Sequence, residues 1–168
     1  MENKVFISHF HWSNEVIAIT CIGLCITVGC LIPLILSKVY LLGLLWLKWA
    51  LVVTLIVPVI YTATWTPRYI SVCDDHFVFK KMRGHIIIPV QTIRDVYEID
   101  ANSLKGSIRT FGSGGVFGYL GRFKNNILGN YSMYITEKKH LIAVKTHDKT
   151  FVFNCNDPNR LVTLIKTQ

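Results

Sequence analysis

The sequence lacks the residue groupings that most metal sites need. Its five cysteines include no Cys-x-x-Cys pair, and its six histidines are scattered along the chain. His9 and His11 are two residues apart and would share one face of a strand, but a zinc site typically takes four ligands. We therefore expect no metal ion and no cofactor.

Residues for nucleophilic catalysis are also missing. Cys155 lies just before a helix start at Asp157, where the pKa of a thiol can fall, but the sequence places no base beside it. Asp74 and Asp75 are adjacent carboxylates of the kind that favours turns. We expect no catalytic residues and no enzyme activity, and an enzyme of envelope or lipid metabolism is the least favoured alternative.

A nucleotide-binding loop is present only in fragments. The stretch from Arg109 to Asn126 reads RTFGSGGVFGYLGRFKNN. Gly112 and Gly114 fit the first two positions of a dinucleotide loop, but Phe117 occupies the third, and no Gly-Lys-Ser/Thr ending follows. No helix opens after these glycines to hold a phosphate at its N-terminus.

Charge is almost absent from the N-terminal part of the chain. No charged residue lies between Glu15 and Lys38, and residues 39–67 contain only Lys48. About 20 apolar residues in a helix cross a bilayer core of about 30 Å. We predict two spans, at about residues 16–36 and 42–64, joined by a short connection into a hairpin. A cleaved signal peptide is the alternative for the first span. A typical signal peptide, however, has a shorter apolar run than this span and a basic segment before it, whereas here Glu15 precedes the run.

The positive charges predict the orientation of this hairpin. Cations precede the first span and follow the second, and the connection carries few of them. Because cytoplasmic segments collect Lys and Arg, we place both termini of this multi-pass protein in the cytoplasm. The flanking cations are Lys4, Arg68, Lys80, Lys81 and Arg83.

Two features inside the predicted spans need an explanation. Lys48 lies between Trp46 and Trp49, so its side chain would reach back to the interface, or it would be a functional charge within the membrane. Cys25 and Gly29 are small residues four apart, a spacing that can seat one helix on another.

From residue 66 onward the pattern changes to short β-branched and aromatic runs between turn residues. Such runs predict an antiparallel barrel or sandwich. Asp157 and Pro158 begin a helix whose Leu161, Leu164 and Ile165 share one face. We expect an α+β membrane protein: a lead-in over residues 1–15, whose FISHFHW could form a strand, a hairpin over 16–65 and a β-domain with one C-terminal helix over 66–168. The predicted strands are YISVC, FVFKK, HIIIPV, DVYEI, SIRTF, YSMYIT, LIAVKT and FVFNC, with hairpin-length gaps at EKKH and HDK.

This layout resembles the bacterial membrane-anchored proteins with a pleckstrin-homology (PH)-like domain. IIIPVQTIRDV (Ile86–Val96) is similar to a segment of bacterial PH-like domains in which a strand ends at Ile-Pro and restarts after a turn. FGSGGVFGYLGRF (Phe111–Phe123) resembles a glycine-aromatic segment of a branch often found in Bacteroidetes. The resemblance covers nearly the whole chain and implies a fold, with no particular chemistry. It also implies that the membrane is a bacterial inner (cytoplasmic) membrane.

The glycine-aromatic segment has two compatible interpretations. Its glycines can mark bends and close backbone approach in a β-domain, with the aromatic rings packed inward or across strands. Alternatively the rings are exposed and, with flanking cations, contact the membrane or a partner. Residues 66–168 carry 15 Lys and Arg and 8 Asp and Glu, a net +7 (15 − 8). The candidate binding residues are Arg109, Phe111, Phe117, Tyr119, Arg122 and Lys124.

We therefore predict a membrane-anchored binding or scaffold module whose partner is a membrane protein or anionic lipid headgroups. The alternative is a structural small subunit or an oligomeric scaffold assembled through the hairpin. Nucleic acid is not expected, because the basic residues are scattered and no groove-reading helix is visible.

Overall fold

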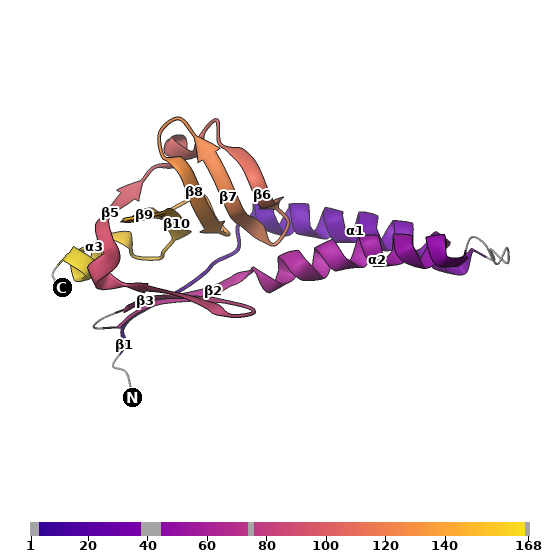
Figure 1. Cartoon of the computed structure of the whole chain (residues 1–168), viewed down its shortest axis with the longest axis horizontal. Coiled ribbons are helices and arrows are strands. Elements are labelled where there is room, and N and C mark those ends of the chain that lie inside the picture. Colours follow the sequence, from indigo (N-terminus) through magenta and orange to yellow (C-terminus); the bar gives the residue numbers. More distant parts are fainter. Residues whose placement is uncertain (1–3, 38–44, 74–75, 167–168) are drawn as a thin grey trace.

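The computed structural model describes residues 4–37, 45–73 and 76–166. Two long helices lie side by side and project from a β-rich domain (Figure 1). Helix α1 covers Asn14–Leu36 and α2 covers Leu45–Thr64. Both predicted spans are therefore confirmed as helices, although their connection at residues 38–44 lies outside the described residues.

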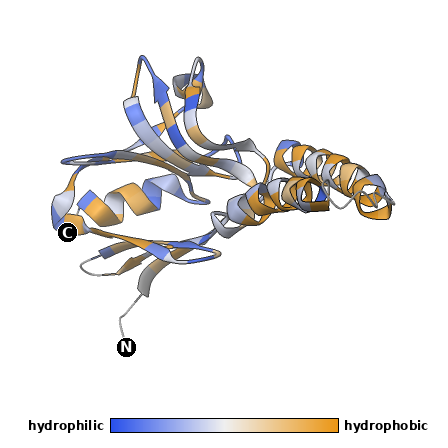
Figure 2. Ribbon diagram, turned by 45° about the vertical axis from the view of Figure 1, so that its right-hand side comes forward, coloured by the Kyte–Doolittle hydropathy of each residue, from blue (hydrophilic) through white to orange (hydrophobic). Residues whose placement is uncertain are grey.

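Both helices are long and apolar enough to cross a membrane by length and composition. Only 6% of the most hydrophobic stretch of each is buried, which is unlike a core helix of a soluble protein. Hydrophobic residues cover most of both helices in Figure 2. Helix α1 begins with a side-chain cap, since Ser13 Oγ accepts a hydrogen bond of 3.3 Å from the Val16 N–H.

Lys48 links the two helices at the end far from the β-domain. Its Nζ donates to the carbonyl of Ile35 at 2.9 Å and to that of Ser37 at 2.8 Å. These carbonyls belong to the C-terminal end of α1, where the helix itself supplies no partners. Lys48 therefore caps α1, a role that the sequence analysis did not predict. Cys25 and Gly29, by contrast, do not seat α1 on α2, because both are exposed and no atom lies within 4 Å of a Cβ built on Gly29.

The first sheet, sheet A, joins the two ends of the helical hairpin. It has the order β1-β2-β3-β4 and is antiparallel. Strand β1 precedes α1 and pairs with β2, which follows α2, so the FISHFHW segment does contain a strand. The whole helical hairpin is thus inserted between two paired strands. The strands are β1 (Lys4–His9), β2 (Pro67–Cys73), β3 (His76–Lys81) and β4 (His85–Pro89). The predicted turn at Asp74 and Asp75 lies outside the described residues.

The second sheet, sheet B, has the order β5-β9-β10-β8-β7-β6. Its strands are β5 (Ile93–Ile99), β6 (Ile108–Gly115), β7 (Gly118–Asn125), β8 (Gly129–Ile135), β9 (Leu141–Thr146) and β10 (Thr150–Asn154), and short 3-10 helices occupy Val90–Thr92 (η2) and Ala101–Leu104 (η3). All eight predicted strands are present. Strand β7, inside the glycine-aromatic segment, was not predicted.

One predicted hairpin in sheet B is wrong. Residues 137–140 do not join neighbouring strands, because β10 lies between β8 and β9 and runs parallel to β8. Sheet B is therefore mixed and not purely antiparallel. The hairpin at residues 147–149, between β9 and β10, is confirmed.

The two sheets face each other as a sandwich, and in the described residues no strand pairing closes them into a barrel. A shared core fills the space between them, with Ile70, Phe77 and Phe79 from sheet A meeting Tyr134 and Phe153 from sheet B. The Phe79 and Phe153 rings lie 4.8 Å apart. Burial of such rings supplies much of the hydrophobic stabilisation of the domain.

Helix α3 (Pro158–Lys166) closes one side of this sandwich (Figure 1). Asp157 Oδ1 accepts from the Arg160 N–H at 3.2 Å, so the predicted N-cap is confirmed. Leu161 and Ile165 are buried in the shared core, and Leu164 packs against it. The helix reaches the edge strand of each sheet: the Arg160 guanidinium lies 5.8 Å from the Phe6 ring in β1, and Lys166 Nζ lies 3.8 Å from Asp95 Oδ1 in β5.

Candidate functional site

The glycine-aromatic segment forms a β-hairpin at one edge of sheet B. Strands β6 and β7 pair antiparallel up to Gly115 and Gly118, and Val116 and Phe117 make the turn. Phe117 has a φ of 58°, a left-handed value that is uncommon for an aromatic residue.

Two glycines in this hairpin allow an unusually close approach of its strands. Gly112 and Gly121 are paired across β6 and β7 and have φ values of 112° and 126°. A Cβ built on Gly112 would collide with the Leu120 carbonyl oxygen, and one on Gly121 with the Phe111 carbonyl oxygen. These positions therefore need glycine for a structural reason, as the first interpretation of the segment proposed.

The β6–β7 turn, defined as residues Gly115–Gly118, lies against α1. The Phe117 N–H donates to Thr20 Oγ1 at 2.9 Å, and the Phe117 ring lies 6.3 Å from the Trp12 ring. Val16 and Thr20 are only 0% and 5% exposed, although most of α1 is open. The turn covers this part of the helix, so Phe117 is a packing residue and only half-exposed.

Tyr119 also contacts residues that lie near the start of α1. Lys138 Nζ lies 4.6 Å from the centre of the Tyr119 ring and 3.4 Å from Glu15 Oε2. The hydrogen bond with Tyr119, with a further contribution from Glu15, raises the pKa of Lys138 despite partial burial. One contact of the Tyr119 ring is therefore with a cation of the same chain, Lys138.

The remaining candidate residues divide between the two faces of the hairpin. Phe111 is opposite Arg122, and Lys124 is two residues further along β7, so these three share one face. Arg109 lies on the other face, where its Nη1 would be 3.2 Å from a Cβ built on Gly114. The structure thus groups Phe111, Arg122 and Lys124 and separates Arg109 from them.

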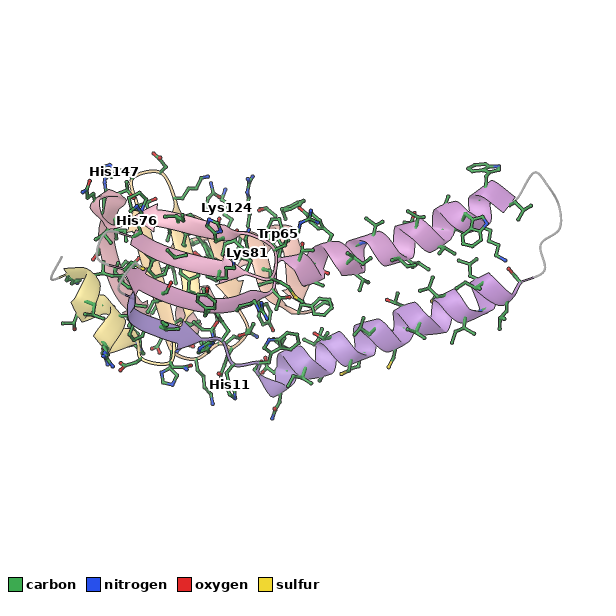
Figure 3. The ribbon with its side chains drawn as sticks, turned by 90° about the horizontal axis from the view of Figure 1, so that it is seen from below. His11, Trp65, His76, Lys81, Lys124 and His147 are labelled. Atoms are coloured by element: carbon green, nitrogen blue, oxygen red, sulfur yellow. The ribbon has the colours of Figure 1, made fainter. Side chains whose placement is uncertain are left out.

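Phe111 is 52% exposed and belongs to an aromatic cluster at the base of α2. Its ring lies 6.1 Å from that of Trp65, which in turn lies 6.3 Å from Tyr134. Lys81 Nζ lies 5.3 Å from the centre of the Trp65 ring, and partial burial lowers the pKa of Lys81. Figure 3 shows Lys81 and Trp65 together where the β-domain meets α2.

Arg122 faces both this cluster and a surface groove. Burial raises the pKa of the Tyr134 phenol, and the positive charge of Arg122 opposes that shift. The groove has a volume of about 440 Å³ and crosses β6, β7, β8 and β10. Its lining residues with polar side chains comprise two cations, one carboxylate, four hydroxyls and an amide: Arg122, Lys149, Asp148, Thr110, Tyr131, Ser132, Thr150 and Asn130. Such a lining can bind an anionic group that approaches Arg122 and Lys149 and avoids Asp148.

Other residues considered in the sequence are not assembled into a site. The strand β1 ends at His9, so His11 is not on its face. His11 lies near the start of α1, whereas His76 and His147 lie at the far end of the β-domain (Figure 3). Within residues 4–37, 45–73 and 76–166, no three His, Cys, Asp or Glu side chains are placed to hold a metal ion. Burial raises the pKa of Cys155, opposite to the fall suggested by its place before a helix.

Several residues of this region escaped the sequence analysis. Thr20 was treated as part of the first apolar span, Trp65 as the residue just after the second span, and Lys138 as part of a turn. Thr20 had a weak signal, since a hydroxyl in an apolar helix needs a hydrogen-bond partner. No spacing in the sequence indicates that Lys138 reaches Tyr119, because the two residues meet only through tertiary structure.

Comparison with known proteins agrees with this architecture. Residues 68–168 match the bacterial PH domain family. The chain belongs to this family. No curated protein and no solved structure is significantly similar to the chain. PH-like domains are in general non-catalytic binding modules, so the family supports a binding or scaffold role at a coarse level.

Proposed function

We propose that this chain is a membrane-anchored PH-like module that binds a membrane-protein partner or anionic lipid headgroups. Helices α1 and α2 cross the cytoplasmic membrane as a hairpin, with both termini and the β-domain on the cytoplasmic side. The protein is not an enzyme. The observation that carries the proposal is the exposed Phe111–Arg122–Lys124 face on a domain fixed to two apolar helices.

The anchor is supported by the apolar surface of the two helices. Among the exposed large hydrophobic residues are Ile22, Ile26 and Ile32 of α1 and Val53 and Ile60 of α2. A contiguous apolar surface of this size is unusual on a soluble monomer. Cations follow α2 and few lie in the connection, which favours a cytoplasmic β-domain.

The attachment of the β-domain to the helices supports presentation of one defined face. Strand β1 leads into α1 and α2 leads into β2, and these two strands pair with each other. The β3–β4 turn adds a contact, because the Arg83 N–H donates to the Thr64 carbonyl at the end of α2 at 3.1 Å. A domain held this way does not swing freely, so its binding surface keeps one height and orientation.

The binding surface combines an exposed ring with cations. Phe111 supplies apolar area, and Arg122 and Lys124 supply charge on the same face. The net +7 of residues 66–168 favours an anionic partner at the membrane surface. Arginine and aromatic residues are also the types that dominate protein interfaces.

In-cell photo-crosslinking from Phe111 tests this function. A photoreactive phenylalanine replaces Phe111, and the same probe at Ile127, which is 67% exposed on the β7–β8 turn, serves as the control. A discrete heavier band from residue 111 alone, or a lipid adduct there, supports the proposal and identifies the kind of partner. If Phe111 and Ile127 give the same products, or if Arg122 and Lys124 can both be replaced by Ser without loss of the adduct, the proposed surface is wrong.

A second function is assembly of an oligomer through the helices. The exposed Cys25 and the open space at Gly29 favour it, because small residues let a second helix approach closely. Oxidative crosslinking of a variant that keeps Cys25 and replaces Cys21 and Cys30 by Ala tests this in native membranes. A disulfide-linked dimer that disappears in Gly29→Leu supports assembly, and a monomer under all conditions rejects it.

A further inference from the structure

We propose that the β6–β7 turn inserts into the bilayer beside α1 and contacts lipid acyl chains just below the headgroups. This inference rests on the proposed membrane anchor. It adds a third membrane-contacting segment that is neither of the two helices.

The contacts with α1 place the turn well inside the length of the helix. A Cβ built on Gly115 would lie 3.0 Å from Ile19 Cδ1, and one built on Gly23 would lie 3.6 Å from Val116 Cγ2. These helix positions are about 8–14 Å beyond Asn14 at about 1.5 Å per residue. A bilayer core takes about 20 residues, so counting back from Leu36 puts its boundary near Ile17. The turn therefore lies on the acyl side of that boundary.

The aromatic residues at the domain end of α2 give an independent estimate of where the membrane interface lies relative to the turn. Tyr61 and Trp65 lie at the domain end of α2 with their rings 5.5 Å apart, and such residues mark the membrane interface. The Trp65 ring contacts Phe111, which is four residues before Gly115 in β6. At about 3.3 Å per residue the strand extends up to about 13 Å past that contact. Figure 1 shows the end of this hairpin beside the first turns of α1.

The composition of the turn suits this environment. Residues 113–120 read SGGVFGYL and contain no charged side chain. The charged groups nearest to the turn lie at its two sides: the Arg109 guanidinium reaches back to Gly114, and Lys138 contacts the Tyr119 ring and Glu15 at the start of α1. We place these groups at headgroup level, where cations meet anionic lipids, and the uncharged residues Gly115–Gly118 beyond them.

Backbone polar groups of the turn are also hydrogen-bonded within the protein, which suits a lipid environment. Unsatisfied amide and carbonyl groups are costly in hydrocarbon, where no water can bond to them. Here the Val116 carbonyl accepts from Ser113 Oγ at 2.6 Å, and the Phe117 N–H donates to Thr20 Oγ1 at 2.9 Å. A turn in water needs neither side chain. Together the two bonds satisfy both polar groups of the central peptide bond of the turn, between Val116 and Phe117.

Depth-dependent fluorescence quenching tests the inference on the full chain in vesicles of phosphatidylcholine and phosphatidylglycerol. Cys21, Cys25 and Cys30 are replaced by Ala and a bimane probe is attached to Val116→Cys, while the buried Cys73 and Cys155 stay in place. A second protein keeps only Cys25 of the three as the probe site within α1, and a third carries Asn126→Cys on the β7–β8 turn. The phosphatidylcholine is brominated either near the headgroup end or near the methyl end of its chains, and iodide is the aqueous quencher.

The expected result is that the probe at residue 116 is quenched at least twofold more by bromine near the headgroup end than by iodide. The Cys25 probe should respond most to deep bromine, and the residue 126 probe to iodide alone. If Cys25 responds to bromine and residue 116 responds only to iodide, the inference fails and the anchor stands. If neither responds to bromine, the anchor fails and the inference fails with it. Should Val116→Cys prevent folding, Gly114→Cys is the substitute site, since its Cβ would meet only the mobile end of Arg109.

Discussion

The backbone N–H of Phe117 donates a 2.9 Å hydrogen bond to the hydroxyl of Thr20, which lies 97 positions earlier in the chain. This bond joins the second sheet to the first apolar helix. The Thr20 hydroxyl in turn donates to the Val16 carbonyl at 2.7 Å, so one side chain serves both the helix and the turn. The β-domain is thus bonded to the helices through sheet B as well as through the two strands that flank the helical hairpin.

Thr20→Val should loosen this attachment. The variant keeps the shape of the side chain but leaves the Phe117 N–H without its partner, which costs about 1–3 kcal/mol. Thr27→Val is the matched control, because the Thr27 hydroxyl donates only to the Gly23 carbonyl in its own helix. Thermal unfolding in detergent should show a lower midpoint for Thr20→Val than for Thr27→Val. Equal midpoints would mean that the turn contributes nothing to stability.

Gly121→Ala should destabilise the β6–β7 hairpin. A methyl group there would meet the Phe111 carbonyl oxygen, and the φ of 126° is unfavourable for alanine. We expect a loss of about 1–3 kcal/mol, typical of overpacking. Gly114→Ala in the same hairpin is the control, because its methyl would meet only the flexible Arg109 side chain. The prediction is checked by chemical denaturation of both variants, and a similar loss in both would contradict the strand-approach argument.

Lys48→Met should weaken the far end of the helical hairpin. The substitution removes both hydrogen bonds to the Ile35 and Ser37 carbonyls, while Ser37 still donates to the Pro33 and Leu34 carbonyls. Because the side chain is partly exposed, we expect a loss of only about 1 kcal/mol. Lys48→Arg keeps a charged donor and should retain part of the stability in a thermal unfolding series. A Lys48→Met protein as stable as the parent would show that the cap has no energetic role.

The contact between Lys138, Tyr119 and Glu15 should make stability depend on alkaline pH. The pKa of Lys138 is raised above 10.5 in the folded chain, so the unfolded chain releases this proton at a lower pH. The stabilisation is therefore fully present below about pH 10 and is lost as pH rises through the folded pKa. The difference in melting temperature between the parent and Lys138→Gln should be constant near neutrality and shrink in alkali. Lys139→Gln, at a neighbouring and more exposed lysine, should show no such trend.

Much of this architecture follows from local patterns in the sequence. The charge-free run at residues 16–37 predicted α1, and the run at residues 39–67, whose one charged residue is Lys48, predicted α2, because apolar runs of about 20 residues are typical of long apolar helices. Alternating β-branched and aromatic runs produced the strands, and Asp157 with Pro158 marked the start of α3. These signals depend on neighbours within a few residues, and so they can be read without the fold.

The glycine-aromatic segment shows where prediction from local sequence patterns fails. Its glycines look like loop residues by composition, and β7 was missed for that reason. Gly112 and Gly121 are nevertheless strand residues, because each lies against the backbone of the opposite strand. The same limit explains the wrong hairpin at residues 137–140, since the insertion of β10 between β8 and β9 is decided by packing of distant strands.

Two apolar helices, most strands and the closing helix could be predicted from short stretches of the chain, because they depend on local periodicity and composition; the PH-like fold was predicted from the resemblance of the layout and two segments to known proteins. The folded chain was needed to show that β1 and β2 pair across the helical hairpin, that Lys48 caps α1, and that Phe117 packs on α1 while Phe111 is exposed. These relationships join residues that are far apart in the chain, so no local pattern contains them. A side chain's role is then set by which partner satisfies its hydrogen bond or covers its ring, and only the folded chain brings those partners together.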